Sequence, residues 1–269
     1  FVYGGCLLTT ACRPANIPHM SIKAVTFDLW DTVFDDESDE PKRLAKGLRS
    51  KPETRHQLLL DALRRHYDIS REALDIAYAT GNAAFYKVWQ EASITWTNRE
   101  RLEVVLKGLG KPLPDDELSV LSHAMEQLEV DLPPDILPGV KSAIEILASR
   151  YKLCVISDTI VTSGAGLRDM LAHYDLLKYF SGFAFSDEVG RSKPHAAMFE
   201  TARMQMEVPF DEMVHIGDRD NKDIKGAQAL GMKAILYTAK RDVDRYTTSA
   251  DAVCTNHDDL VGIIDTIGE

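Results

Sequence analysis

An acidic residue, Asp28, directly follows the short apolar run 24–27. A carboxylate at the end of a buried strand lies where open α/β sheets bind ligands, in the crevice beyond the carboxyl ends of the strands. Such a group can attack phosphorus and form an acyl phosphate, which divides one difficult displacement into two easier steps. An Asp that merely ends a strand or caps a turn is the usual alternative, so a role for Asp28 needs support from elsewhere in the chain.

Further polar groups follow downstream, and these are Ser157, the Lys193-Pro194 pair, Gly217-Asp218 and Asp223. A hydroxyl at a strand end donates a hydrogen bond to an anion, a lysine neutralises its charge, and carboxylates supply the oxygen ligands that Mg²⁺ prefers. Each residue type is common in ordinary loops. In this order, and together with Asp28, they indicate phosphoryl transfer through an aspartyl intermediate. Two other residues of this region are interpreted as structural, Asp220 as a solvated loop acid and His215 as a core histidine.

The elements that position these groups are predicted to alternate between strands and helices. Apolar runs predict strands at 22–27, 153–156, 182–185, 214–216 and 234–237, and the first of them has the composition of a strand buried on both faces. Helical periodicity lies between the strands, beginning with an amphipathic helix after Gly139. Strands that alternate with helices imply parallel βαβ units with right-handed crossovers, so the predicted fold class is α/β.

Residues 35–134 have a different character. Charged residues and helix formers dominate this stretch, and apolar residues recur at helical spacing. Asn98-Arg99-Glu100-Arg101 predicts a helix start, and Gly108 and Gly110 would close that helix. Because no strand is predicted here, we interpret the stretch as a helical insertion after the first strand of the sheet.

With these motifs in this order, the chain from Ile22 onward resembles the haloacid dehalogenase superfamily, whose members are mostly phosphohydrolases. The resemblance implies a Rossmann-like three-layer core with a parallel sheet, and an all-α cap domain inserted between the first and second motifs. The implied core covers residues 21–34 and 135–269, and the implied cap covers 35–134. Residues 1–20 would form an N-terminal extension, which we expect to be disordered.

The resemblance also implies roles for the polar groups. Asp28 matches the family's nucleophile, and Lys193 matches a lysine that neutralises charge between the nucleophile and the phosphoryl group. Thr32 and Ser157 match hydroxyl groups that bind the transferring phosphoryl oxygens. Asp158 follows Ser157 in the same substrate-binding segment, at a position where Asn is common in the family.

A magnesium site is implied by the same match. Asp218 matches the acid that binds Mg²⁺, and Asp28 and the Trp30 carbonyl would complete the protein's share of the ligands. Asp223 would contact the groups that bind the metal and would orient them. Gly217 would allow a tight turn before Asp218.

The first motif departs from the family pattern at Trp30. The common phosphatase version has a second Asp there, which protonates the leaving oxygen and later activates water, a contribution of typically about 10²–10⁴-fold. An indole cannot exchange a proton near neutral pH. The adjacent Asp31 occupies the usual Gly position, and successive residues that leave a strand point in different directions, which argues against Asp31 as a substitute.

Three explanations of Trp30 stay open. The first is a phosphatase whose leaving group needs little protonation, such as an acyl phosphate or an anhydride, or one whose leaving group is protonated by the cap or by solvent. The second is a 2-haloacid dehalogenase, since halide departs without a proton and an aromatic residue is common at this position. Such enzymes need no metal, however, and they carry Ser and Asn where this chain has Asp218 and Asp220. The third is a catalytically impaired member that binds a ligand or a protein partner, and the retained Asp28, Lys193 and Asp218 argue against it.

Composition limits the partners. The formal net charge of −11 argues against nucleic acid or an anionic membrane as the main partner, and no apolar stretch approaches the length of a membrane span. The four cysteines form no metal-like or redox pair, so we expect a cytoplasmic protein in a reducing compartment. The sequence therefore predicts a Mg²⁺-dependent hydrolase of a small phosphorylated metabolite, present as a monomer or homodimer.

Overall fold

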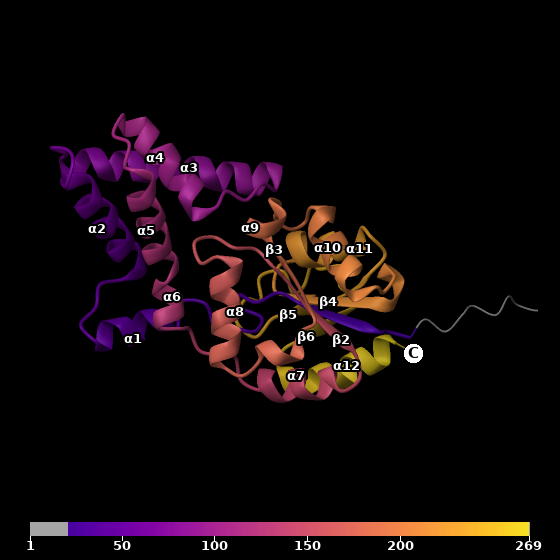
Figure 1. Cartoon of the computed structure of the whole chain (residues 1–269). Coiled ribbons are helices and arrows are strands. Elements are labelled where there is room, and N and C mark those ends of the chain that lie inside the picture. The colour runs from indigo at the N-terminus through magenta and orange to yellow at the C-terminus, as the bar shows by residue number, and fades with distance from the viewer. Residues whose placement is uncertain (1–20, 269) are drawn as a thin grey trace, which may run out of the picture.

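A parallel six-stranded sheet forms the centre of the protein, in the order β3-β2-β1-β4-β5-β6 (Figure 1). The computed structural model describes residues 21–268, so the predicted disordered extension 1–20 lies outside it. The strands are β1 (Ala24–Phe27), β2 (Lys152–Ser157), β3 (Gly182–Phe185), β4 (Met213–Gly217), β5 (Lys233–Tyr237) and β6 (Ala252–Cys254). The five predicted strands are confirmed. The sequence predicts no strand at β6, because three residues at a sheet edge carry too little pattern.

The register of β1 explains how distant residues meet. Phe27 pairs with Val155 of β2 on one side and with Ile216 of β4 on the other, and all three strands are parallel. The residues that follow these strands therefore emerge at one edge of the sheet. Asp28 emerges there from the central strand of the three.

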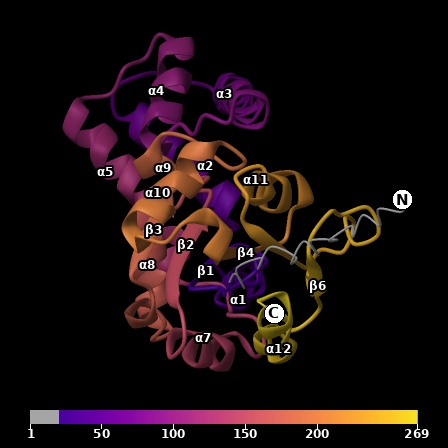
Figure 2. The same ribbon diagram turned by 90° about the vertical axis from the view of Figure 1, so that its right-hand side faces the viewer.

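Helices cover both faces of the sheet, and the predicted three-layer α/β arrangement is confirmed (Figure 2). One face packs against α7 (Val140–Ala148), α8 (Gly164–His173) and α12 (Leu260–Ile267), and the other against α10 (Ala196–Met206) and α11 (Lys225–Gln228), with α9 (Ser186–Val189) preceding α10. One-turn helices lie at Leu177–Tyr179, Phe210–Glu212, Asp220–Ile224 and His257–Asp259. Val25 and Phe27 point into one cluster and Ala24 into the other, so β1 is buried on both faces as predicted.

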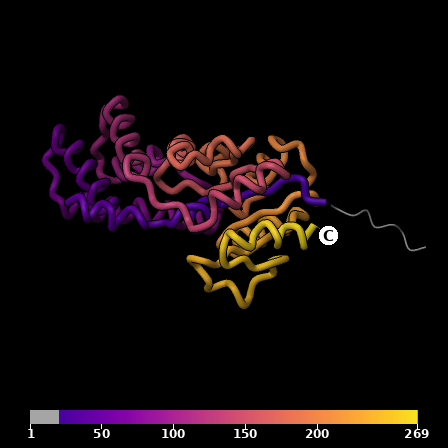
Figure 3. Tube along the Cα trace, turned by 90° about the horizontal axis from the view of Figure 1, so that it is seen from below, coloured from indigo at the N-terminus to yellow at the C-terminus, as the bar shows by residue number. Residues whose placement is uncertain are grey.

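Seven helices lie between β1 and β2, and the first six of them occupy one end of the molecule (Figures 1 and 3). These six are α1 (Asp39–Ala45), α2 (Lys51–Arg64), α3 (Arg71–Ala92), α4 (Asn98–Leu109), α5 (Asp115–Glu126) and α6 (Leu128–Asp131). Helices α2 to α5 share a buried apolar cluster of their own. The prediction of helices without a strand agrees with this segment, and its assignment as a separate cap domain stays a prediction.

Helix α4 begins where its sequence predicts. The Thr97 hydroxyl accepts a hydrogen bond from the backbone of Glu100, and the Glu100 side chain accepts one from the backbone of Thr97. Gly110, with φ of 64°, ends the helix in the left-handed conformation that favours glycine, while Gly108 lies inside it. These two caps fix the ends of α4, and the Thr97 cap fixes the start of the first turn, which carries Arg101.

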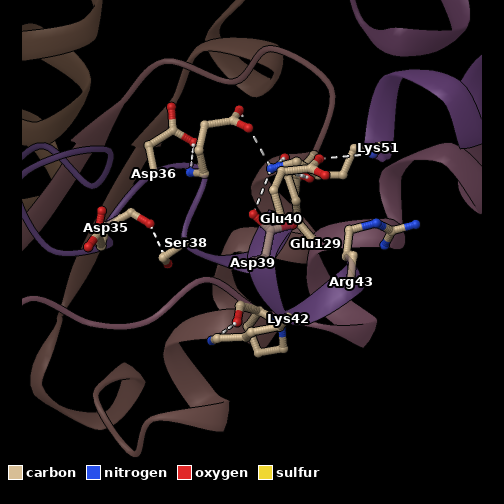
Figure 4. A network of polar contacts seen from close by, with 12 residues as sticks. Asp35, Asp36, Ser38, Asp39, Glu40, Lys42, Arg43, Lys51 and Glu129 are labelled. Carbon is tan, nitrogen blue, oxygen red and sulfur yellow. Dashed lines mark hydrogen bonds and ion pairs between the residues drawn. The ribbon is translucent and has the colours of Figure 1, made fainter. Parts of the chain in front are cut away.

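A buried ionic network holds α1, α2 and α6 of the helical segment together (Figure 4). Lys51 Nζ lies 2.8 Å from Asp39 Oδ1 and 3.0 Å from Glu129 Oε1. Glu129 also accepts a hydrogen bond from the Thr162 hydroxyl, in the loop that follows β2. The network therefore ties α1, α2 and α6 to the strand end from which Asp158 emerges. No helix within residues 21–268 is long and apolar enough to cross a membrane.

Candidate active site

Three buried carboxylates meet at the carboxyl edge of the sheet. Asp28, Asp218 and Asp223 each place one oxygen within 4.8 Å of the others. Lys193 Nζ lies 2.7 Å from Asp28 Oδ1 and 2.6 Å from Asp223 Oδ1. The structure thus brings together four of the predicted site residues, which are up to 195 positions apart (223 − 28) in the chain.

The Lys193 ammonium compensates part of this negative charge. Burial by itself lowers the pKa of Lys193, but the nearby Asp223, Asp28 and Asp158 raise it well above its ordinary value, so Lys193 is charged. Asp158 also positions the lysine, because its Oδ1 accepts the backbone N–H of Lys193 at 2.9 Å. Its Oδ2 pairs with Lys222 Nζ at 2.7 Å. Both Asp158 oxygens are therefore bound to the protein itself, and its predicted contact with substrate stays a prediction.

Asp223 is held from three sides. Besides Lys193, His215 Nε2 lies 3.2 Å from Oδ1, and Oδ2 accepts the backbone N–H of Arg219 at 2.9 Å. Although burial opposes ionisation, Lys193 and His215 hold the pKa of Asp223 well below its usual range. A Cβ on Gly217 would lie 2.3 Å from Asp223 Cγ, so the glycine is required by close packing and not by a left-handed turn. His215 also contacts the Thr26 hydroxyl at 2.8 Å, as expected of a core histidine.

The negative charges of the Asp28 and Asp218 carboxylates are only partly offset by nearby cations. Burial raises the pKa of both side chains, and repulsion from Asp223 and Asp28 helps raise the pKa of Asp218 to about 8. Asp218 Oδ2 is buried and accepts no hydrogen bond within the described chain, and Arg219 Nε is 3.6 Å from it. A buried carboxylate oxygen without a partner, beside two other carboxylates, fits the oxygen-rich environment that Mg²⁺ prefers.

The two predicted phosphate-binding hydroxyls are buried nearby. Thr32 Oγ1 has no hydrogen-bond partner in the described part of the chain. The Ser157 hydroxyl donates only to the Asp158 carbonyl, at 3.4 Å. Neither hydroxyl group lines the cavity described next, so their contact with a phosphoryl group stays a prediction.

A cavity of about 500 Å³ lies between the carboxyl edge of the sheet and the helical segment. Its sheet side includes Asp28, Trp30, Asp158, Lys193 and Asp223, and its helical side includes Arg55, Tyr78, Asn82, Tyr86, Trp89 and Arg101. This volume suits a small metabolite. The helical residues do not stand out in the sequence, because an Arg, Asn or Tyr on an amphipathic helix is typical of a solvated face.

Trp30 lines this cavity, and Asp31 does not. The Trp30 ring is half-buried, and its centroid lies 6.0 Å from the centroid of the Phe34 ring. Asp31 has φ of 54°, the left-handed conformation expected at the usual Gly position, and its Oδ1 accepts the Asp36 backbone N–H at 3.3 Å. The Asp31 carboxylate is therefore part of a turn, which agrees with the prediction that it does not replace the missing acid.

The prediction for Asp220 is wrong. This carboxylate is buried, and it pairs with Lys225 Nζ at 2.8 Å. It also accepts hydrogen bonds from the Thr248 hydroxyl at 2.6 Å and the Ser249 backbone at 3.3 Å. Asp220 thus anchors the segment before β6 to the turn that carries Asp223, a contact that depends on residues about 28 positions away in the chain.

Without a divalent metal, the folded protein is expected to lose stability as the pH rises from about 4 to about 8. Asp218 has a pKa near 3.8 in the unfolded chain and about 8 in the folded protein, so only the folded state keeps this proton across that window. The stabilisation is complete below the unfolded pKa and is lost as the pH passes through the folded pKa. Mg²⁺ binds the deprotonated carboxylate, so it should restore stability most strongly at pH 8.

Urea unfolding at pH 5 to 8, with EDTA or with Mg²⁺, measures this effect. Asp218→Asn should flatten the pH dependence and remove most of the stabilisation by Mg²⁺. Asp68→Asn, at an exposed position of the helical segment, should change neither. Equal stabilisation of wild type and Asp218→Asn by Mg²⁺ would contradict a metal site at Asp218.

Comparisons with known proteins agree with this geometry. Residues 22–231 match the family model of haloacid dehalogenase-like hydrolases. The chain is 26% identical over 211 residues to ribulose-1,5-bisphosphate 5-phosphatase of Halopiger xanaduensis, which covers 76% of this chain and 83% of that protein. It is 26% identical over 222 residues to glyceraldehyde 3-phosphate phosphatase of Methanopyrus kandleri, covering 80% and 83%.

A solved structure of 2-haloacid dehalogenase from Pseudomonas syringae has a similar fold, with a TM-score of 0.64, 24% identity, and coverage of 91% of this chain and 99% of that one. At this identity the likeness concerns the fold alone. The family model extends from the start of β1 past α11 and includes every residue of the carboxylate cluster. The chain therefore belongs to the haloacid dehalogenase-like hydrolases.

Proposed function

We propose that this enzyme is a Mg²⁺-dependent phosphatase of a small phosphorylated metabolite and acts through an aspartyl phosphate on Asp28. The observation that carries the proposal is the cluster of three buried carboxylates beside Lys193, of which Asp28 and Asp223 line a cavity of about 500 Å³. Relatives named as phosphatases of ribulose 1,5-bisphosphate and glyceraldehyde 3-phosphate support a small phosphorylated substrate.

Asp28 would be the nucleophile. Its carboxylate forms a bond to phosphorus while the bond from phosphorus to the leaving oxygen breaks, and the leaving oxygen keeps the electron pair. Water then attacks the aspartyl phosphate, releases inorganic phosphate and regenerates the carboxylate. Lys193 holds Asp28 in place and offsets the charge of the phosphoryl group, and Thr32 and Ser157 would donate hydrogen bonds to its oxygens.

Asp28, Asp218 and the Trp30 carbonyl would hold the Mg²⁺ ion. When bound, the ion offsets the mutual repulsion of the carboxylates and of the substrate phosphate. Asp223 is occupied by Lys193, His215 and the Arg219 backbone, so we assign it the positioning of Lys193. The helical segment 35–134 would act as a cap that closes over the substrate and excludes water.

One assay tests the proposal against its nearest alternative, a 2-haloacid dehalogenase. That alternative is favoured by the Trp30 side chain, which lines the cavity together with Asp28. Release of phosphate from a panel of phosphorylated metabolites is measured with and without Mg²⁺, beside release of halide from 2-chloropropionate. We expect phosphate release that depends on Mg²⁺ and no halide release. Metal-independent halide release without phosphatase activity would refute the proposal.

The wild-type enzyme is expected to cleave acetyl phosphate at least about 100-fold faster than ethyl phosphate, because Trp30 cannot protonate an alkoxide leaving group. Trp30→Asp should raise the rate on ethyl phosphate by roughly 10²-fold, since it supplies the missing acid. Trp30→Asn is the matched control, because it opens the same space without a carboxyl group. Equal rates for the Asp and Asn variants would contradict this account of Trp30.

A further inference from the structure

Arg101 is a buried cation without a carboxylate partner. Its side chain projects from α4 and is 7% exposed. Its hydrogen-bond partners are the neutral Ile160 carbonyl and, at 2.7 Å, Asn82 Oδ1. Its guanidinium lies 4.2 Å from the centre of the Phe85 ring. Among residues 21–268, no acidic side chain lies within ion-pair distance of it, whereas buried charges in proteins are normally paired.

The Nε donor of Arg101 is unused among residues 21–268. Nε is buried and has no hydrogen-bond partner in the described structure. Arg101 lines the same cavity as Asp28 and Lys193. A buried guanidinium with a spare donor at a ligand cavity indicates that an anionic ligand completes its contacts, because a guanidinium matches the geometry of carboxylate and phosphate.

A second arginine reinforces this side of the cavity. Arg55 Nε is also buried and unpartnered among the described residues. Its terminal nitrogen reaches Glu129 Oε1 at 3.4 Å, but that oxygen is already 3.0 Å from Lys51 Nζ. Glu129 is therefore shared between Arg55 and Lys51, which also pairs with Asp39, and the Nε donor of Arg55 is left for a further acceptor.

We propose that the substrate carries a second anionic group, and that Arg101, assisted by Arg55, binds this group on the helical side of the cavity. The inference rests on the proposed phosphatase function, which places the reacting phosphoryl group at Asp28. Arg101 contacts Ile160, two residues beyond Asp158, so one small molecule within about 500 Å³ can lie between the two sites. The second group is a carboxylate or a phosphate, since both match the guanidinium.

Two matched pairs of probes test the inference. Phosphoglycolate carries a carboxylate where hydroxyethyl phosphate carries a hydroxyl, and propanediol bisphosphate carries a phosphate where hydroxypropyl phosphate carries a hydroxyl. The wild-type enzyme should prefer the doubly anionic member of at least one pair by about 10-fold or more in kcat/KM, and the preferred pair identifies the group. Equal kcat/KM within both pairs would overturn the inference.

Variants separate binding from a purely structural role of Arg101. Arg101→Met should raise KM for the preferred probe with two anionic groups by about 10–100-fold, and should leave kcat/KM for the matched probe with a hydroxyl in place of the second group within about 3-fold. Arg101→Lys keeps the charge but loses the planar guanidinium that binds an anion with two N–H groups. Its KM should therefore lie between the KM of wild type and that of Arg101→Met. Arg99→Met is the matched control on the same helix, because Arg99 pairs with Glu103 and Asp115 outside the cavity, and it should have no effect.

The alternative is that Arg101 only braces α4 against the Ile160 loop, in which case Arg101→Met would lower activity on both members of a pair equally and overturn the inference. If Arg101→Met does not fold, Arg55→Met gives the same comparison with the Ile160 contact intact. If these four alkyl phosphates release no phosphate but acetyl phosphate does, the proposed function stands, because Trp30 cannot protonate an alkoxide; if acetyl phosphate releases none either, the proposed function fails by itself. The inference is then decided by thermal shifts, where the member with two anionic groups must stabilise wild type more than its hydroxyl partner in at least one pair, and Arg101→Met must lose this difference.

Discussion

Asp28→Asn is expected to reduce phosphate release by roughly 10⁴–10⁶-fold, in the range seen when the nucleophile of a covalent enzyme is removed. A carboxamide of the same shape cannot form the acyl phosphate. The protein should stay folded, because burial raises the pKa of Asp28 and therefore disfavours its charged form in the metal-free state. Lys193 keeps its second partner, Asp223, at 2.6 Å. The loss of activity should therefore come without a loss of stability.

Steady-state phosphate release and urea unfolding in EDTA measure the two halves of this result. Asp68→Asn is again the control for an Asp-to-Asn change outside the site. A variant that folds normally and still hydrolyses acetyl phosphate at more than about 1% of the wild-type rate would remove Asp28 as nucleophile. A folded variant with lower stability than wild type would show that the Asp28 charge is better compensated than its surroundings indicate.

Lys193→Met is expected to lower the free energy of unfolding by about 3–5 kcal/mol, the usual effect of leaving buried charges without their partner. Lys193 is 2% exposed and contacts Asp28 and Asp223, so its removal leaves these two buried side chains without the ammonium group that they share. Activity should be lost as well, because the ammonium also offsets the charge of the substrate. Urea unfolding at pH 7 in EDTA measures the stability, and exposed Lys107→Met serves as the control.

A double-mutant cycle tests the cause. Asp28→Asn in the Lys193→Met background removes one of the uncompensated carboxylates, so it should recover about 1–3 kcal/mol of the lost stability. In the wild-type background, where the Lys193 ammonium is present, Asp28→Asn should not increase the free energy of unfolding. Additive effects of the two substitutions would mean that Lys193 stabilises the fold through packing and not through its charge.

The sequence is sufficient for the architecture. Apolar runs of three to six residues between helical segments predict β1 to β5, because strands buried on both faces need a continuous apolar sequence. The helical segment follows from its 3.6-residue periodicity, and Thr97 with Glu100 marks the start of α4. Strand β6 is missed because it has three residues at the sheet edge and is defined by its pairing with β5.

For the site, local sequence identifies groups that follow strands and not groups that project from helices. Asp28, Ser157 and Asp218 directly follow or end parallel strands, and such residues must meet at one sheet edge. Arg55 and Arg101 lie on helices, where position along the chain does not say whether a side chain faces solvent or a cavity. Their role depends on how the helical segment sits over the sheet.

The amino-acid sequence by itself determined the α/β fold, the helical insertion and the edge at which the acidic groups gather, because periodicity and strand order are local or topological properties. Only the tertiary structure decided the electrostatic partners: Lys193 between Asp28 and Asp223, both oxygens of Asp158 bound to the protein, Asp220 buried and paired, and Arg101 buried without an anion. The physical reason is that the charge state of a buried group, and whether its hydrogen-bond donors and acceptors have partners, depend on distances of a few ångströms to residues remote in the chain. No local sequence pattern records these distances.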